Sequence, residues 1–365
     1  MNILILANHM NTGGISTYVL TLGEGLVQSG HKVWVMSADG DCRGNLDKVG
    51  VVHVPVGMKL KSGAHPLLWL NLPTVVRFIK QKNIHIIHAQ TRVTSVLSSV
   101  ASLMTGIPFI STCHGFFSPK LSRLLFPCWG KAVIAISKPV KEHLETGFNV
   151  PSDRIVLIPN GINVQVFKPI PLLQRQQQRE ARDMQGNPMI GIIARLSSVK
   201  GIDVLIAAMP SVLQQYPQAC LWIVGQGDQE AYLKECVRKH RVESSVQFFT
   251  HVQESRALLP LFDVFVMPSI QEGLGLSVIE AQACGVPVVA SKVGGLVDLI
   301  EDGKTGFLVE PRDHLALAKG IMAILKDPQR AASMAVQARR QVESRFNAQD
   351  MVNATYACYE QYSRR

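Results

Sequence analysis

The chain has 365 residues, of which 47% are hydrophobic and 18% are charged, and its formal net charge is +10. This length predicts two domains rather than one core. No apolar run approaches the roughly 20 residues that a membrane-spanning helix needs, and the seven cysteines show neither a Cys-x-x-Cys pair nor zinc spacing. Composition therefore argues against a membrane-spanning chain, a disulfide framework and a zinc scaffold, and we expect a cytoplasmic protein with reduced thiols.

The positive charge is concentrated in the first half of the chain. Residues 1–170 contain 16 Lys and Arg against 7 Asp and Glu, whereas residues 171–365 contain 21 against 20. A basic surface attracts anionic partners. Two interpretations stay open: a basic face that only keeps the chain soluble, or a surface that meets an anionic membrane or a phosphate-bearing acceptor. We expect no nucleic acid as a partner.

Short runs of β-branched and apolar residues alternate with helical patterns along the whole chain. In the first half, strands are predicted at residues 2–7, 31–37, 51–56, 84–89, 108–114, 132–137 and 154–159, with helices at 16–29, 73–82 and 94–105. In the second half, strands are predicted at residues 189–195, 220–225, 245–250, 264–269, 286–291 and 306–310. This alternation predicts an α/β protein with two doubly wound, Rossmann-like domains.

A composition change separates the two predicted domains. Residues 168–188 are rich in Pro, Gln and Arg and poor in strand formers, which is typical of a linker. We predict a first domain over residues 1–167, this linker, a second domain over residues 189–346, and a separate C-terminal segment over residues 347–365.

The first predicted domain carries two candidate binding features. Gly13 and Gly14 form a turn between the first strand and the first helix, where backbone N–H groups suit an anion or a sugar. His114 ends the strand at 108–114, and a histidine there is either structural or part of a site. Residues 39–41 read Asp-Gly-Asp, but they follow the second strand in a glycine-containing turn, so we interpret them as a loop and expect no metal ion.

Residues 115–131 interleave Phe, Leu and Trp with Lys120, Arg123 and Lys131. A short amphipathic helix is predicted between Pro119 and Pro127. Two interpretations stay open for this segment: packing under a loop, or a surface that faces a membrane or a lipid-linked acceptor.

The second predicted domain has cations directly after its first strand. Arg195 and Lys200 follow the strand that ends near residue 195. Open α/β sheets bind ligands beyond the carboxyl ends of their strands. Two cations in such a loop can neutralise a diphosphate, and each pair of opposite charges 4 Å apart is worth about 4 kcal/mol before desolvation.

Two carboxylates flank a glycine turn and a helix start later in the same domain. Glu272 precedes Gly275, and a helix is predicted to begin near Leu276 and Ser277 and to contain Glu280. The free N–H groups of a helix start suit a phosphate. Carboxylates are poor phosphate ligands, so these two are suited to hold hydroxyl groups. A phosphate together with hydroxyls indicates a sugar nucleotide.

The sequence resembles the retaining glycosyltransferases with the GT-B fold, in particular glycosyltransferase family 4. The resemblance rests on the Glu-x7-Glu segment EGLGLSVIEAQACGVPVVAS at 272–291, on NTGGISTYVLTLGEGLVQSGHKV at 11–33, and on Arg-x4-Lys-Gly at 195–201. It spans nearly the whole chain. It implies two Rossmann-like domains that face each other across a crevice, with the C-terminal segment crossing back as a helix onto the first domain.

The same resemblance implies roles for the candidate residues. Arg195, Lys200 and the helix start near Leu276 would hold the diphosphate. Glu280 would hold the ribose and Glu272 the donor sugar. All five of these groups come from the second domain.

The resemblance also implies roles for residues outside this group. His114 would contact the donor sugar from the first domain, beside Gly13 and Gly14. His88 resembles another family motif, but the usual second histidine is Gln90 here, so we expect a structural role for His88.

Two further segments match the family more weakly. His251 and Val252 are the nearest candidates for reading the base. Asn160 and Gly161 match a family turn near the crevice, although Asn163 stands where Asp is common.

The expected function is retaining transfer of a sugar from a UDP-, GDP- or ADP-sugar to an acceptor hydroxyl, with no metal and no cofactor. The expected acceptor is lipid-linked or a glycan, in lipopolysaccharide, exopolysaccharide or glycolipid biosynthesis at the inner face of the cytoplasmic membrane. Two alternatives stay open: a sugar-nucleotide epimerase of the same fold, and a catalytically idle nucleotide-sugar-binding protein. The intact set of candidate residues disfavours the idle alternative.

Overall fold

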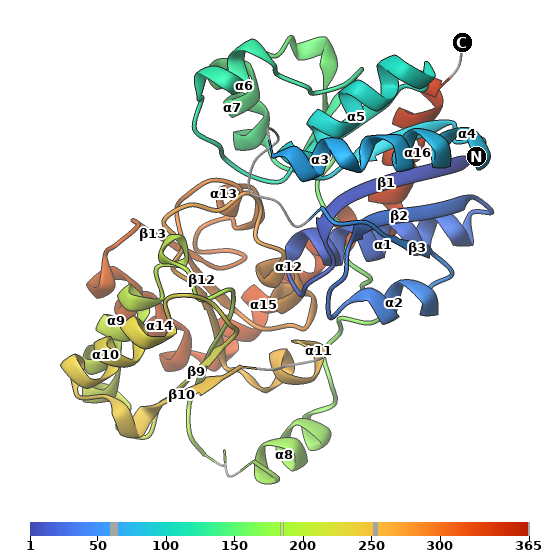
Figure 1. Ribbon diagram of the computed structural model, residues 1–365. Coiled ribbons are helices and arrows are strands. Elements are labelled where there is room, and N and C mark those ends of the chain that lie inside the picture. The colour runs from blue at the N-terminus through green and yellow to red at the C-terminus, as the bar shows by residue number, and fades with distance from the viewer. Residues whose placement is uncertain (59–64, 183, 185, 251–254, 364–365) are drawn as a thin grey trace. The chain divides into compact units, whose positions relative to one another are not determined.

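The computed structural model describes residues 1–58, 65–182, 184, 186–250 and 255–363 (Figure 1). The chain divides into two compact units: unit 1 comprises Met1–Gly161 and Ala348–Arg365, and unit 2 comprises Ile162–Asn347. The predicted α/β fold with two parallel sheets is confirmed, because the described strands form one seven-stranded and one six-stranded sheet.

The sheet of unit 1 is parallel at every described pairing. Its order is β3-β2-β1-β4-β5-β6-β7. The strands are β1 (Asn2–His9), β2 (Lys32–Ala38), β3 (Val52–Pro55), β4 (Ile86–Ala89), β5 (Phe109–Cys113), β6 (Val133–Ala135) and β7 (Ile155–Leu157). The helices are α1 (Gly14–Gln28), α2 (Arg43–Lys48), α3 (Pro66–Leu70), α4 (Leu72–Gln81), α5 (Arg92–Thr105), α6 (Leu121–Leu125), α7 (Lys138–Phe148) and α16 (Ala348–Ser363).

The central strand β1 shows why helices cover both faces of this sheet. Ile3 and Ile5 pack in a core with α1 and α16, whereas Leu4 and Leu6 pack in a second core with α4 and α5. Successive side chains of a strand point to opposite faces. Because an uninterrupted apolar strand has no polar face, both of its faces must be covered.

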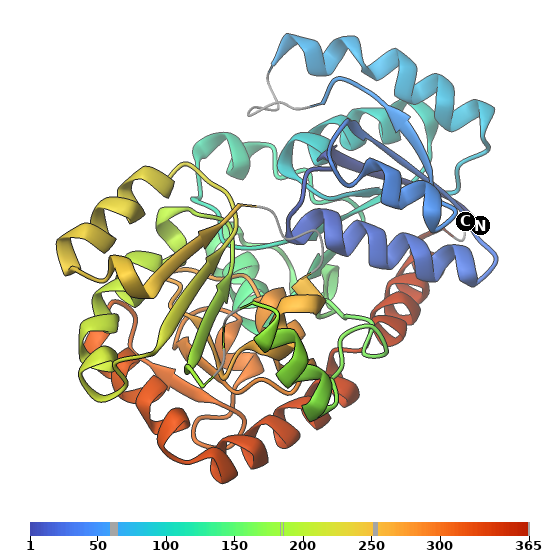
Figure 2. The same ribbon diagram turned by 90° about the horizontal axis from the view of Figure 1, so that it is seen from below.

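The helix α16 belongs to unit 1 although it comes last in the chain. It packs along α1 (Figure 2). The helices approach closely at Gly25, where an added Cβ would lie 2.5 Å from a methyl carbon of Val352. Thr355 and Tyr359 of α16 are fully buried. A side chain larger than hydrogen at Gly25 would therefore push α16 off the core.

The sheet of unit 2 is also parallel at every described pairing. Its order is β10-β9-β8-β11-β12-β13. The strands are β8 (Met189–Ile193), β9 (Cys220–Val224), β10 (Val246–Phe249), β11 (Val264–Met267), β12 (Val288–Ser291) and β13 (Phe307–Val309). The helices are α8 (Leu172–Glu180), α9 (Ile202–Gln215), α10 (Glu230–His240), α11 (Ser255–Leu258), α12 (Leu276–Ala283), α13 (Leu296–Leu299), α14 (His314–Lys326) and α15 (Pro328–Arg345).

The segment predicted as a linker contains α8, which is attached to unit 2. Arg175 and Arg179 of α8 form ion pairs with Asp263 at 2.7 and 3.0 Å. The other oxygen of Asp263 accepts the backbone N–H of Met189 at 2.7 Å. These bonds tie α8 to the start of β8 and to the residue before β11.

Candidate functional site

In unit 2, the loops that follow β8 and β11 touch through their backbones. The N–H of Ile270 donates to the carbonyl of Val199 at 2.8 Å. Gly201 has φ 60°. An added Cβ at Gly201 would lie 2.1 Å from the carbonyl oxygen of Pro268. Only glycine combines this φ with so close an approach. The contact brings Lys200 and Glu272 from different loops to one place.

Lys200 and Glu272 form a partly buried ion pair. Lys200 Nζ lies 2.6 Å from Glu272 Oε2, and the side chains are 19% and 12% exposed. Ser269 Oγ donates to the same oxygen at 3.2 Å. An ammonium group has three donors. Two donors of Lys200 therefore remain for a second anion, while Glu272 is held in one orientation.

Arg195 lies beside this pair in sequence but is exposed. Its guanidinium forms no ion pair with the described residues. The next residue, Leu196, donates its N–H to Gln226 at 2.9 Å. Cβ atoms added at Gly225 and Gly227 would lie 1.9 and 2.0 Å from carbonyl oxygens of the Arg195 loop. The two glycines after β9 are therefore explained by this close backbone approach.

The start of α12 offers unpaired backbone donors. Gly275 precedes the helix with φ 102°. The N–H groups of Val278 and Ile279 both donate to Gly275. Those of Leu276 and Ser277 have no partner among the described residues. A helix start with free N–H groups binds anions well.

Glu280 lies inside α12 and is 8% exposed. Ser255 Oγ donates to its Oε2 at 3.3 Å. Burial raises the pKa of Glu280 to about 7, although the Ser255 bond opposes that shift. Near neutral pH the carboxyl group is therefore divided between its acid and its carboxylate form.

In unit 1, His114 directly follows β5 at the carboxyl edge of the sheet. Its Nε2 lies 2.9 Å from Gln90 Oε1. The ring of Tyr18 packs edge-on against it, with centroids 5.0 Å apart. Burial lowers the pKa of His114 to about 3, so the ring is neutral at physiological pH. Sequence reasoning noted Gln90 only as a departure from the family and missed its contact with His114.

His88, for which we expected a structural role, is fully buried with both ring nitrogens bonded. Nδ1 lies 2.6 Å from the hydroxyl of Tyr359, and Nε2 lies 2.7 Å from Thr112 Oγ1. Neither nitrogen is left for a ligand.

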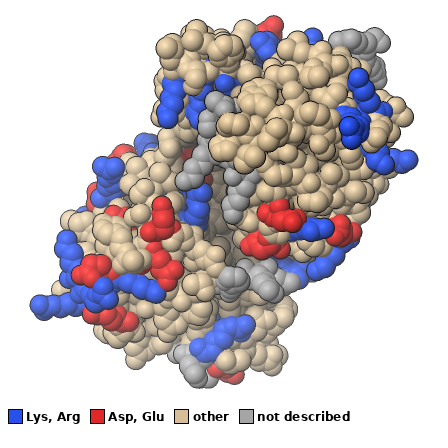
Figure 3. Space-filling view, viewed as in Figure 1, with Lys and Arg blue, Asp and Glu red and all other residues tan. Residues whose placement is uncertain are grey.

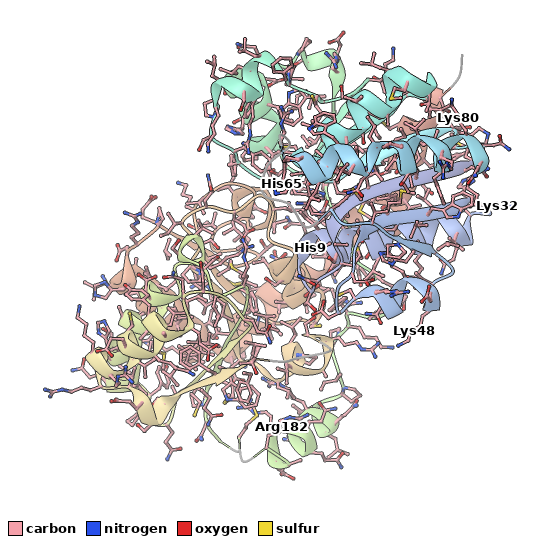
Figure 4. The ribbon with its side chains drawn as sticks, in the orientation of Figure 1. His9, Lys32, Lys48, His65, Lys80 and Arg182 are labelled. Atoms are coloured by element: carbon pink, nitrogen blue, oxygen red, sulfur yellow. The ribbon has the colours of Figure 1, made fainter. Side chains whose placement is uncertain are left out.

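Gly13 and Gly14 form the start of α1, at the same edge of the sheet. Figure 4 labels His9 at this carboxyl end of β1 and Lys32 at the opposite, amino end of β2. An added Cβ at Gly13 would meet no atom within 4 Å, so the turn is open. Asp41 holds the turn by accepting from the N–H and the hydroxyl of Thr12 at 2.5 and 2.7 Å.

The carboxylate of Asp41 therefore joins the Asp-Gly-Asp loop at residues 39–41 to the turn before α1. In the described part of the chain, no three His, Cys, Asp or Glu side chains group as metal ligands would.

The segment 115–131 contains only the five-residue helix α6, none of whose residues is buried. Leu121, Leu125 and Phe126 are 70%, 65% and 69% exposed. Packing under a loop therefore does not describe these three side chains. Among the described residues, no helix has the length and apolar character of a membrane span.

The structure groups most predicted site residues at two edges. Arg195, Lys200, Glu272, Gly275, Leu276, Ser277 and Glu280 belong to the carboxyl edge of the unit 2 sheet, and Gly13, Gly14 and His114 belong to that of unit 1. His251 and Val252 lie outside the described residues. The sequence did not predict the two serines that donate to these carboxylates. Ser269 bonds to Glu272 and Ser255 bonds to Glu280, and neither serine lies in a recognisable motif.

Comparison with known proteins covers both units. The family described as Glycosyltransferase Family 4 matches residues 12–166, and the family described as Glycosyl transferases group 1 matches residues 174–341. An uncharacterized glycosyltransferase of Methanocaldococcus jannaschii is 28% identical over 374 positions, covering 95% of this chain and 94% of the relative. Glycogen synthase of Mycobacterium tuberculosis is 30% identical over 290 positions, covering 75% of this chain and 68% of that enzyme. The fold matches that of Anabaena HepE, solved in complex with UDP-glucose, with TM-score 0.88, 24% identity, and coverage of 99% and 100%.

Proposed function

The chain belongs to glycosyltransferase family 4, whose GT-B members use nucleotide sugars, and we propose that it is a retaining, metal-independent enzyme of this family. The observation that carries this proposal is the Lys200–Glu272 pair at 2.6 Å beside the open start of α12. It combines a cation, free N–H donors and a carboxylate, which are the groups that a diphosphate joined to a sugar requires.

In the proposed reaction, the acceptor hydroxyl attacks the anomeric carbon on the face from which the nucleoside diphosphate departs. The C–O bond to phosphate breaks, the new glycosidic bond forms on the same face, and the hydroxyl proton leaves with the diphosphate. Charge on the diphosphate grows as the bond breaks. Arg195, Lys200 and the N–H groups of Leu276 and Ser277 therefore stabilise the transition state more than the bound donor.

The carboxylates and unit 1 residues receive complementary roles in this proposal. Glu272 accepts from hydroxyls of the donor sugar, and Glu280 accepts from the ribose. His114 accepts from or donates to the sugar, and Gly13 and Gly14 leave space for it. No cofactor takes part, because the cations and N–H groups supply the charge that a metal ion would otherwise bring.

The donor and the mechanism are tested together. A thermal-shift panel of UDP-, GDP- and ADP-sugars identifies the base, and the anomeric proton couplings of the product identify retention. Incubation of the donor alone distinguishes transfer from epimerisation, which would yield an epimer. Activity unchanged by EDTA is expected, and activity that is lost with EDTA and restored by Mg²⁺ would contradict metal independence.

Glu272→Ala tests the site itself. We expect turnover to fall by about two orders of magnitude, since the sugar loses a hydrogen bond and Lys200 loses its partner. Glu310→Ala, an exposed carboxylate on the same unit, is the control and should keep wild-type turnover. Near-normal turnover of purified Glu272→Ala would refute the assignment.

The proposed acceptor is lipid-linked or a surface glycan, and the proposed location is the inner face of the cytoplasmic membrane. Leu121, Leu125 and Phe126 are exposed beside Lys120 and Arg123. Figure 3 shows Lys and Arg on unit 1 between wide uncharged areas. Exposed apolar groups flanked by cations suit the headgroup region of an anionic bilayer.

Flotation with vesicles of phosphatidylglycerol and phosphatidylcholine tests this surface. We expect the triple variant Leu121→Ser, Leu125→Ser, Phe126→Ser to lose most of the binding. Leu172→Ser with Leu173→Ser, which removes two leucines exposed by 68% and 66% on unit 2, is the matched control. Equal flotation of wild type and triple variant would contradict the membrane contact.

A further inference from the structure

Behind His114, unit 1 contains a run of buried polar side chains that the proposed function does not use. His88 lies two positions before Gln90, and Thr112 lies two positions before His114. Side chains two apart on a strand share a face. The ends of β4 and β5 therefore carry two adjacent cross-strand pairs: His88 with Thr112 at 2.7 Å, and Gln90 with His114 at 2.9 Å.

The inner pair, which is His88 with Thr112, is held by Tyr359 of α16. The hydroxyl of Tyr359 lies 2.6 Å from His88 Nδ1, across 271 residues of sequence, and both side chains are fully buried. A buried phenol must donate its proton or leave a donor unsatisfied. Tyr359 therefore donates to Nδ1, and the neutral ring of His88 donates from Nε2 to Thr112 Oγ1. One tautomer of His88 satisfies both partners.

Tyr18 of α1 joins the inner pair to the outer pair. Its ring packs edge-on against both histidines, with centroids 6.3 Å from His88 and 5.0 Å from His114. Its hydroxyl lies 3.5 Å from Thr112 Oγ1. A shift of His88 or Thr112 would therefore displace the ring that supports His114.

In the outer pair, which is Gln90 with His114, Gln90 determines which ring nitrogen of His114 carries the proton. Oε1 of Gln90 can only accept, so His114 donates from Nε2. In the neutral ring, Nδ1 is then an acceptor, and it has no partner among the described residues. Gln90 Nε2 is buried without a described partner. Such an orphan donor costs about 1–3 kcal/mol. The bond to His114 is therefore the one described hydrogen bond of the Gln90 side chain.

We propose that Gln90 and Tyr359 are positioning residues for His114: Gln90 keeps its proton on Nε2, so that Nδ1 is presented as the acceptor for a hydroxyl of the donor sugar, and Tyr359, through His88, Thr112 and Tyr18, holds the ring in place. This inference rests on the proposed function, because it takes His114 to touch that sugar. It makes α16 part of the support of the unit 1 site.

Kinetics of the full-length protein test the effect on the reaction. Gln90→Leu and Tyr359→Phe should each lower kcat about tenfold and change KM for the donor less than about twofold, because a misplaced acceptor weakens a bond needed in the transition state. Tyr356→Phe on the same helix is the matched control; its hydroxyl lies 3.4 Å from Glu360, and its kcat should stay at the wild-type value.

Nitrogen-15 NMR of histidine-labelled protein tests positioning without any activity. Signals of His114, assigned by their loss in His114→Asn, should report a ring protonated at Nε2 in wild type and a mixture of tautomers in Gln90→Leu, whereas Tyr359→Phe should shift these signals and leave the proton on Nε2. A wild-type pattern in Gln90→Leu would overturn the inference, even if Tyr359→Phe failed to fold.

The two measurements separate this inference from the proposed function. Altered tautomers with unchanged kcat would overturn the contact of Nδ1 with the sugar. If the wild type transferred no sugar from any donor while Gln90→Leu still changed the His114 tautomer, the proposed function would fail and the placement of the His114 proton by Gln90 would stand.

Discussion

The two carboxyl edges of this protein carry different kinds of polar groups. The edge of unit 2 holds Lys200 and Glu272 as an ion pair, an exposed Arg195 and a buried acid, Glu280. The edge of unit 1 holds a neutral histidine, His114, bonded to an uncharged amide. Both edges come from the same strand–helix architecture. The loops, and not the fold, therefore decide which polar groups each edge presents.

This difference matches two different recognition tasks. Charged groups suit a diphosphate, whose charge grows when the sugar leaves. Neutral hydrogen-bonding groups of fixed orientation suit hydroxyls, because an analogue that lacks a hydroxyl leaves them unpaired. In the proposed function, unit 2 holds the part of the donor that departs, and unit 1 reads the part that is transferred.

Removing the cation from the unit 2 edge should have the largest effect. Lys200→Ala is expected to lower kcat about 10²–10³-fold, because the diphosphate loses a donor and Glu272 is left without its partner. The measurement is steady-state turnover of the purified variant. Lys234→Ala, which breaks an exposed ion pair with Glu230 at 2.7 Å, is the control. A decrease in kcat of less than tenfold would contradict a contact between Lys200 and the diphosphate.

Displacing the loop that carries Lys200 should come next. Gly201→Ala forces φ 60° on a residue with Cβ and places that carbon 2.1 Å from the carbonyl of Pro268. We expect about 3 kcal/mol of lost unfolding free energy, with reduced turnover. Gly44→Ala is the control, since an added Cβ there meets nothing within 4 Å. Equal urea midpoints for both variants would contradict the close approach.

The buried acid should make unit 2 sensitive to rising pH. The pKa of Glu280 is raised from 4.5 to about 7, so the folded state binds the proton more tightly than the unfolded state. Its stability contribution is fully present below pH 4.5 and is lost as pH rises through 7. Between pH 5 and 8, wild type should lose roughly 2–3 kcal/mol more than Glu280→Gln. If the free energies of unfolding of wild type and Glu280→Gln, measured with urea, changed with pH in parallel, burial would not raise the pKa of Glu280.

Substitution of His114 at the unit 1 edge should have the smallest effect on turnover, and the size of that effect should not depend on pH. His114→Ala is expected to lower kcat about tenfold. Because the pKa of His114 is near 3, its ring stays neutral at pH 5.5 and at pH 8. The ratio of wild-type to variant kcat should therefore be equal at both pH values. A ratio that changes between them would mean that His114 titrates during the reaction.

Much of the fold could be predicted because its signals are local. The apolar runs that form β1 and β8 read as strands without tertiary information, and so does the helix start at Leu276 after Gly275. The polar composition of residues 168–188 indicated a linker with a helical piece, but it did not show how that helix, α8, is held. There α8 is held by Arg175 and Arg179 on Asp263, a contact that joins distant parts of the sequence.

The sequence by itself determined where candidate site residues lie. Arg195, Lys200 and Glu272 were predicted because each follows a strand, and Glu280 because it lies in the helix that begins after Gly275; strand ends and helix starts are recognisable from local patterns. Only the tertiary structure decided how these groups act. The pairing of Lys200 with Glu272, the raised pKa of Glu280 and the support of His114 by Gln90 and Tyr359 depend on burial and on contacts between residues far apart in the chain. No local pattern carries that information.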